Sequence, residues 1–232
     1  MKRAVYVQLP PARRVLDFGC GTGWVLAEAE TEGNPLRFGI DYSLAALRGD
    51  WGSPQLDKGR ANPVIRFVVG DGLRLPFADG AFDVVIGHVS TPYMNTAKAL
   101  GEIYRVLAPG GSLWLTYHNF YCAGERLWRS LRAGRWKDVV FTGYALINGL
   151  LNHFSLPQTQ AWWRRSLFET VNTPRGVARS AAKQGFILIS MEHTRRRIFF
   201  VATARKPGGE GEAVLPAPAW AVYRPLAKKP AM

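Results

Sequence analysis

The residues best suited to chemistry form a glycine-rich turn followed by acids at wider spacing. The turn is Val15–Gly23, VLDFGCGTG, and the acids are Asp41 in GIDYS and Asp71 in GDGLRLP. A glycine turn between a strand and a helix lets the backbone approach a ligand closely and points amide groups at it. A carboxylate can accept hydrogen bonds from two neighbouring hydroxyl groups. Together these residues predict a site for a nucleotide-like or adenosine-like ligand.

The spacing of the glycines separates the ligand classes. A dinucleotide fingerprint has glycines at its first, third and sixth positions, but the sixth position counted from Gly19 is Trp24. The other two glycines of the turn are Gly21 and Gly23. A phosphate-binding loop would need Gly-Lys-Ser/Thr, which does not follow here. The turn therefore favours an adenosine ligand without phosphates.

The elements that must position these groups alternate between strand and helix. Apolar runs predict strands at Arg13–Phe18, Leu36–Asp41, Ile65–Gly70, Phe82–His88 and Ser112–His118. Helical patterns lie between them, at Trp24–Glu30, at Leu44–Arg48 after a Ser43 N-cap, and at Asn95–Leu107 before Pro109-Gly110-Gly111. Strands that are apolar throughout predict a parallel sheet covered on both faces, which is a doubly wound α/β arrangement.

The alternation stops at residues 119–166. This segment holds four of the eight tryptophans, a basic stretch at Glu125–Trp136 and an apolar stretch at Val139–Leu151. A helix at Pro174–Gln184 follows, and then strands at Phe186–Met191 and Arg197–Ala204 that are close enough to pair antiparallel. We expect one domain over residues 1–204, with a helical insertion at 119–166 that could act as a lid, and an irregular tail over 205–232.

Four segments resemble motifs of the class I S-adenosylmethionine-dependent methyltransferases. VLDFGCGTG is similar to their first motif, with Asp17 before the glycines. Asp41 matches the acid that grips both ribose hydroxyls, and Asp71 matches the acid beside the adenine. RVLAPGGSLWLT, residues 105–116, resembles the segment that leads into the fifth strand. The resemblance covers residues 12–118 well and 167–204 loosely.

The resemblance implies a fold, a cofactor and a set of binding residues. The fold is a Rossmann-like methyltransferase fold, with a mostly parallel seven-stranded sheet, an antiparallel edge strand and a helical insertion after the fifth strand. The cofactor is S-adenosyl-L-methionine. Its expected binding residues are Asp17, Gly19, Cys20, Gly21, Gly23, Asp41, Tyr42, Asp71, Gly72 and His88. Asp17 would lie near the positively charged amino-acid end of the cofactor, or would fix the turn as a capping carboxylate.

Methyl transfer from a sulfonium needs alignment and exclusion of water, and it needs a base only when the acceptor loses a proton. The catalytic candidates are His88, Tyr93 and His118, which lie at or just after the ends of the fourth and fifth strands. Each could instead be a hydrogen-bonded residue that lines the cofactor. His153 is a further candidate from the insertion. Four histidines and two cysteines without a ligand pattern predict no catalytic metal.

The charge of the chain bears on the acceptor. The net charge is +13, yet residues 1–118 hold 12 basic and 11 acidic side chains, so the excess lies in the second half. Arg126, Arg129 and Arg132 give Glu125–Trp136 a basic amphipathic pattern. Such a helix could lie on an anionic membrane, grip an acidic acceptor, face nucleic acid, or be a solvated lid helix whose Leu and Trp pack on the domain. The same alternatives hold for Trp162–Arg165, whereas Arg195–Arg197 is typical of a solvated turn.

These features predict an S-adenosylmethionine-dependent methyltransferase that acts on a small-molecule or lipid- or carbohydrate-linked acceptor. Two alternatives stay open: an RNA methyltransferase, and a non-catalytic S-adenosylmethionine-binding partner. Only Cys20 and Cys122 are present, and neither a signal-peptide core nor a long apolar run occurs. We therefore expect a cytoplasmic protein that could contact an anionic membrane peripherally through residues 125–136.

Overall fold

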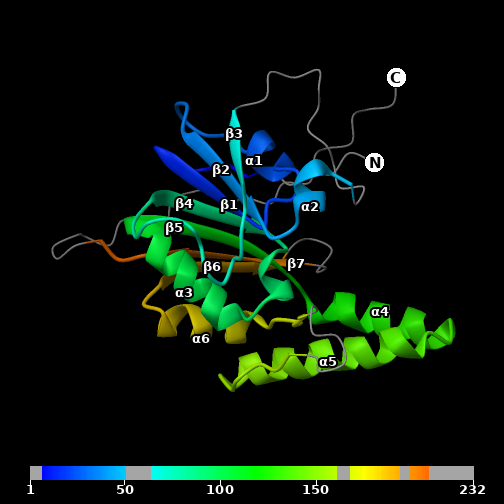
Figure 1. The fold of residues 1–232 in the computed structure, drawn as a ribbon. Helices are drawn as coiled ribbons and strands as arrows, with labels where there is room; N and C mark the ends of the chain where they lie inside the picture. Colours follow the sequence, from blue (N-terminus) through cyan, green and yellow to red (C-terminus); the bar gives the residue numbers. More distant parts are fainter. Residues whose placement is uncertain (1–6, 51–63, 161–167, 194–198, 209–232) are drawn as a thin grey trace, which may run out of the picture.

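The computed structural model describes residues 7–50, 64–160, 168–193 and 199–208. Figure 1 shows one twisted sheet with helices on both faces, in the strand order β3-β2-β1-β4-β5-β7-β6. The strands are β1 (Arg14–Phe18), β2 (Leu36–Asp41), β3 (Ile65–Val69), β4 (Phe82–His88), β5 (Leu107–His118), β6 (Ile187–His193) and β7 (Phe199–Arg205). The helices are α1 (Trp24–Glu28), α2 (Leu44–Arg48), α3 (Thr96–Val106), α4 (Phe120–Arg132), α5 (Trp136–His153), α6 (Pro174–Lys183) and the short 3₁₀ helix η1 (Thr91–Tyr93).

The sheet has the topology that the sequence predicts. Strands β1 to β5 pair in parallel, and β7 pairs antiparallel with both β5 and β6. The antiparallel pairing is thus confined to one edge region of the sheet, where β7 lies between β5 and β6. This confirms the Rossmann-like, mostly parallel seven-stranded fold, with a helical insertion after β5.

Two apolar layers flank the sheet. On one face, Leu100 and Ile103 of α3 and Val177 of α6 are buried in one cluster. On the other face, Leu26 of α1 is buried with Trp114 of β5. Because both faces are covered, the central strands are apolar at nearly every position, as in parallel sheets generally.

Local sequence signals account for several helix starts. The Ser43 side chain accepts a hydrogen bond from the Ala46 amide at 3.2 Å and caps α2. Thr173 caps α6 in the same way, through the Gly176 amide at 2.9 Å, and Pro174 occupies the first turn. These contacts satisfy amides that have no partner within the helix.

Several predicted boundaries near the sheet are wrong. Helix α3 ends at Val106, and β5 begins at Leu107 instead of Ser112. The Pro-Gly-Gly sequence therefore lies inside the strand, in an irregular region where the Gly110 amide donates to the Lys206 carbonyl at 3.1 Å. Helix α1 ends two residues earlier than predicted, because Glu30 forms a parallel bridge with Gln8.

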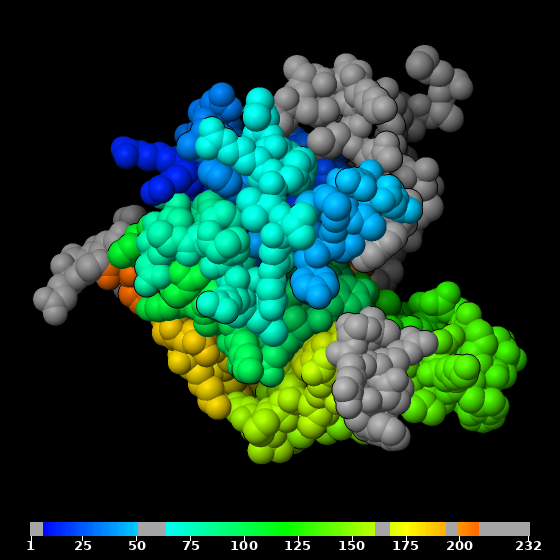
Figure 2. Space-filling view, in the orientation of Figure 1, coloured from blue at the N-terminus to red at the C-terminus, as the bar shows by residue number. Residues whose placement is uncertain are grey.

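The predicted basic helix at 125–136 is divided between two helices. Helix α4 ends at Arg132, the chain turns at Gly134 with a φ of 63°, and α5 begins at Trp136. These helices form the α4–α5 hairpin, residues 120–153, which stands away from the sheet (Figures 1 and 2). Trp128 and Leu131 are 57% and 40% exposed there, whereas Leu127 is partly buried, so this face of α4 is only partly covered.

Some predicted features lie outside the described residues. These are Trp162–Arg165, Arg195–Arg197 and the tail from residue 209 onward. Within the described residues, no helix combines the length and the apolar character needed to cross a membrane.

Candidate active site

The glycine turn follows β1 and is held against the end of β2. The Gly19 and Cys20 amides donate to the Ile40 carbonyl at 2.8 and 3.0 Å. Gly19, Gly21 and Gly23 all have positive φ, at 71°, 53° and 76°. A side chain at Gly19 would collide with Ser90, whereas Gly21 has open space around it. The turn therefore needs glycine at position 21 for its conformation alone, and at position 19 for close packing as well.

Asp41 ends β2 and faces this turn. Its Oδ2 accepts a hydrogen bond from the Gly21 amide at 3.0 Å, and its Oδ1 accepts one from the Ser43 amide at 2.9 Å. Each carboxylate oxygen has two acceptor positions, so both oxygens retain capacity for a hydroxyl group. The backbone therefore fixes the orientation of the carboxylate that the sequence assigns to the ribose.

The remaining predicted binding residues lie at the same edge of the sheet. Asp71 is exposed, and its Oδ1 accepts a hydrogen bond from the Leu73 amide at 2.8 Å. Gly72 packs so closely on Phe18 that a side chain there would collide with the ring. Tyr42 is largely exposed beside Asp41.

Asp17 is a buried carboxyl group with one unpartnered oxygen. Its exposed fraction is 1%, and no hydrogen bond reaches Oδ2. Burial and the nearby Asp41 raise its pKa to about 8, although a bond to the Leu26 backbone opposes the shift. A buried carboxylate is stabilised by a cation placed beside it. The site thus fits a ligand with positive charge and vicinal hydroxyls, as S-adenosylmethionine has.

Cys20 lies inside the turn but is poorly suited to nucleophilic chemistry. Burial, followed by the charges of Asp17 and Asp41, raises the pKa of its thiol well above the usual value. The nucleophilic form of cysteine is the thiolate, which this environment disfavours. Cys20 therefore serves the site as a small, neutral, buried side chain.

His88 lies at the end of β4 among aromatic rings and one hydroxyl group. Its Nδ1 is 2.8 Å from the Thr116 Oγ1, and its ring lies edge-on to Trp24 and near Phe199. The next residue, Val89, has a φ of 56°, and its amide donates to the Thr116 Oγ1 at 3.0 Å. A β-branched residue rarely adopts this conformation, so the loop after β4 is strained next to the candidate site.

Tyr93 and His118 both interact electrostatically with Arg126, which forms an ion pair with Glu169. The Arg126 Nη1 donates to the Glu169 Oε1 at 2.6 Å, and its Nε donates to the Thr142 hydroxyl at 3.0 Å. Burial and Glu169 raise the pKa of Tyr93. Burial and Arg126 lower the pKa of His118 to about 4. At neutral pH, Tyr93 is therefore protonated and His118 is uncharged.

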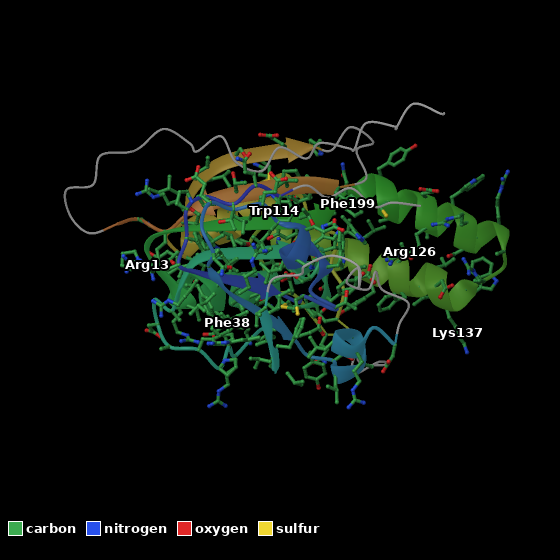
Figure 3. The ribbon with its side chains drawn as sticks, turned by 90° about the horizontal axis from the view of Figure 1, so that it is seen from above. Arg13, Phe38, Trp114, Arg126, Lys137 and Phe199 are labelled. Carbon is green, nitrogen blue, oxygen red and sulfur yellow. The ribbon has the colours of Figure 1, made fainter. Side chains whose placement is uncertain are left out.

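The structure thus brings the predicted residues into two groups at one edge of the sheet. The first is the cofactor cradle around the glycine turn, and the second contains His88, Tyr93 and His118. His153 does not join them, because its Nδ1 pairs with the Thr173 hydroxyl at 2.9 Å at the start of α6. Figure 3 shows Arg126 on the part of the hairpin nearer the sheet and Lys137 toward its far end.

Sequence reasoning missed Glu169, Thr142 and Thr116 as parts of this site. Glu169 is 43 residues from Arg126 in the chain and carries no motif. Thr116 lies within an apolar strand, where nothing in the sequence distinguishes it from an ordinary strand residue. Only the fold brings these side chains to the candidate catalytic residues.

Comparisons with known proteins find methyltransferases among the relatives of this chain. A family profile described as a methyltransferase domain matches residues 16–115. The demethylmenaquinone methyltransferase of Thermus thermophilus is 40% identical over 118 residues, which cover 48% of this chain and 50% of that protein. The phthiotriol/phenolphthiotriol dimycocerosates methyltransferase 1 of Mycobacterium ulcerans is 35% identical over 118 residues, covering 50% and 41%. The chain therefore matches about half the length of these curated relatives or less.

Solved structures share the fold at low sequence identity. An S-adenosylmethionine-dependent methyltransferase from Mesorhizobium loti has a TM-score of 0.52 at 16% identity, covering 84% of this chain and 91% of that chain. The cyclase SpnF has a TM-score of 0.52 at 20% identity, covering 87% and 77%. Since a cyclase has the same architecture, the fold alone does not define the reaction. The family profile and the sequence relatives thus show that residues 16–115 are similar to methyltransferase domains, and the solved structures show that the chain shares their fold.

Proposed function

We propose that this protein transfers a methyl group from S-adenosylmethionine to a small-molecule or lipid-linked acceptor. The observation that carries the proposal is the cofactor cradle, in which the backbone orients Asp41 and Asp17 is a buried carboxyl with a free oxygen. The names of the relatives support the acceptor class, because they give demethylmenaquinone and phthiotriol or phenolphthiotriol dimycocerosates. A carbohydrate-linked acceptor is the remaining variant of this proposal.

The cofactor supplies a methyl group on a sulfonium, which is a good leaving group. In this proposal, Asp41 binds the ribose hydroxyls, Asp71 lies beside the adenine and Asp17 faces the cationic end. The residues of the chain then align the acceptor with the methyl group and exclude water, which can supply much of the acceleration.

The pKa directions distinguish the candidate catalytic residues. His118 is a weak base, because burial and Arg126 lower its pKa to about 4. The Tyr93 hydroxyl is a hydrogen-bond donor at neutral pH, since a phenol is protonated there and the pKa of Tyr93 is raised further. Where the acceptor must lose a proton, the proposal assigns that role to His88, with Tyr93 and His118 positioning the acceptor.

The α4–α5 hairpin supports a role in covering and delivering the acceptor. Helix α4 begins two residues after His118, at the edge of the sheet that carries the candidate site. We propose that the insertion at residues 119–166 covers the acceptor. Peripheral contact with an anionic membrane through residues 125–136 would give it access to a lipid-linked acceptor.

Titration calorimetry with S-adenosylmethionine tests the cofactor part of the proposal. We expect the intact protein to bind and Asp41→Ala to bind about 100-fold or more weakly, because two charge-assisted hydrogen bonds are lost. Asp50→Ala is the matched control, since Asp50 is an exposed acid beyond α2. No binding by the intact protein, or equal binding by Asp41→Ala, would contradict the proposal.

Methyl transfer to fractionated cell extract tests the acceptor class. With radiolabelled cofactor, we expect label in the lipid or small-molecule fraction. Label in RNA, together with RNA affinity that falls steeply with salt, would favour the RNA methyltransferase alternative. Cofactor binding without label in any fraction would favour the non-catalytic alternative.

A further inference from the structure

Helix α5 has its polar face toward the protein and its apolar face toward solvent. The buried positions of α5 are mostly small or polar: Thr142, Tyr144, Ala145, Asn148, Gly149 and Asn152. Val140, Ile147, Leu150 and Phe154 lie on the other side and are 51% to 61% exposed. A surface helix of a globular protein normally has the opposite arrangement.

Buried hydrogen bonds hold α5 in this orientation. The Asn148 amide group donates to the Thr159 and Glu169 carbonyls at 2.9 and 3.1 Å, and its oxygen accepts from the Thr159 amide at 2.9 Å. The Asn152 Nδ2 donates to the Asn172 Oδ1 at 2.8 Å. Rotating the helix to bury its apolar face would break these bonds, and unpaired buried polar groups are costly.

A glycine contact also fixes the helix. A Cβ atom at Gly149 would lie 2.0 Å from the Val171 carbonyl oxygen, so α5 approaches that segment as closely as the backbone allows. The outward direction of Ile147 and Leu150 therefore follows from the packing of the opposite face. Within the described residues, these two side chains remain open to solvent.

The tip of the hairpin adds aromatic and basic side chains to this surface. Trp128 and Trp136 are 57% and 67% exposed, and the Arg132 guanidinium lies 4.8 Å from the centroid of the Trp128 ring. Between residues 128 and 138, four basic side chains accompany one acid, Asp138. The basic residues are Arg129, Arg132, Arg135 and Lys137, and all of them are exposed.

We propose that the α4–α5 hairpin docks on an anionic lipid bilayer through this surface, with the outward face of α5 against the acyl boundary. The docking surface consists of Trp128, Leu131, Trp136, Val140, Ile147, Leu150 and Phe154, with the four basic residues beside it. Tryptophan rings are enriched at membrane–water interfaces, and basic side chains attract anionic headgroups. A helix with one apolar face lies in the plane of the interface.

This inference rests on the proposed function. Docking of the hairpin would place the candidate site beside a membrane that holds a lipid-linked acceptor. Charge complementarity is what favours a bilayer over a second copy of the chain. The tip is strongly basic, so two copies that met through it would repel each other, whereas an anionic surface attracts it.

Vesicle co-sedimentation tests the proposal. We expect the full chain to bind vesicles that contain phosphatidylglycerol and to bind pure phosphatidylcholine vesicles much more weakly. Ile147→Ser/Leu150→Ser should weaken binding about 10-fold or more, because two apolar side chains are lost from the contact. The matched control is Ile187→Ser/Leu188→Ser, which removes the same exposed residue types from the edge strand β6.

A charge reversal tests the electrostatic part. Arg129→Glu/Arg132→Glu should weaken binding about 25-fold or more, since each basic residue near an anionic surface contributes about fivefold. Arg175→Glu/Lys183→Glu makes the same change in net charge on α6 and should bind like the original protein. Equal weakening by this control would show a nonspecific charge effect and overturn the assigned surface.

Two further measurements separate the possible failures. Cofactor titration on every variant shows whether the rest of the fold is intact, and we expect unchanged affinity. A chain that binds cofactor but no vesicles overturns the docking proposal alone, and a chain that binds vesicles but no cofactor overturns the proposed function alone. A dimer in solution that Ile147→Ser/Leu150→Ser converts to a monomer, without vesicle binding, would assign the surface to a second copy.

Discussion

The carboxyl group of Asp17 should make the stability of the protein depend on pH. Its pKa is raised from 3.8 to about 8 in the folded protein, so the native state holds a proton that the unfolded state has released. Stability should therefore fall as pH rises from about 4 to about 8, and then level off. We expect Asp17→Asn to remove this part of the pH dependence. Urea unfolding at several pH values in this window measures the difference.

The control for Asp17 is the exposed acid Asp50. Asp50→Asn removes an exposed carboxyl group, and the pH curve of Asp17→Asn is compared with the curve of this variant. If Asp17→Asn follows the same pH curve as the original protein, the carboxyl at position 17 titrates normally.

Single residues of the cofactor cradle could be predicted because their chemistry is local. Gly21 has a positive φ, and Asp41, at the end of the adjacent strand, accepts a hydrogen bond from the Gly21 amide. The acceptor side could not be predicted in this way. In the sequence, Arg126 is one of several regularly spaced basic residues. In the fold, it donates hydrogen bonds to Glu169 and Thr142.

Among the elements, α5 has a buried side chain, Asn148, that contributes several of the hydrogen bonds fixing its position. Asn148 is fully buried and makes hydrogen bonds to Thr159 and Glu169. Asn148→Ala should lower the free energy of unfolding by about 2 kcal/mol, because groups that pair with the amide lose their partner. Chemical denaturation measures this loss.

Asn119→Ala is the matched control for Asn148. Asn119 precedes α4, and among the described residues its side-chain amide has a 3.3 Å contact with the His193 ring at an exposed position. We expect a change within about 0.5 kcal/mol there. Equal effects of the two substitutions would mean that the buried bonds of Asn148 do not hold the hairpin.

Element boundaries show which local signals can mislead. The Pro-Gly-Gly sequence after α3 predicts an end to regular structure, yet β5 already begins at Leu107. The strand begins that early because Leu107 already pairs with Phe82 of β4, a contact that the local sequence does not indicate. The apolar stretch at Val139–Leu151 does not indicate which face of α5 is buried, and in the fold the face that carries the side-chain amides is the buried one.

At the scale of the whole molecule, stability is expected to be unevenly distributed. Strands β1, β4 and β5 lie in the middle of the sheet with both faces covered, whereas residues 128–138 are exposed at all positions except Ser130. Hydrogen exchange measured by mass spectrometry should therefore be slowest in these strands and much faster at the hairpin tip. S-adenosylmethionine should slow exchange at residues 19–23. A hairpin tip as protected as β4 would contradict this distribution.

The overall fold could be predicted because parallel strands and crossover helices leave a regular pattern over residues 13–118. The charge could be assigned to the second half of the chain, but the sequence did not reveal the surface that carries it. The α4–α5 hairpin, which Figure 1 shows away from the sheet, carries five of the basic side chains of that half. Only the contacts of α5 with the rest of the protein decide which of its faces meets solvent.

The position of β7 has a consequence for synthesis of the chain. β5 pairs with β7 from Ser112 opposite Arg205 to His118 opposite Phe199, so this edge of β5 has no native partner in β7 until residues 199–205 are made. An unpaired strand edge can recruit other chains. During translation, the nascent protein therefore carries an open, apolar β5 edge while more than eighty further residues emerge. A chaperone that shields this strand would act in that interval.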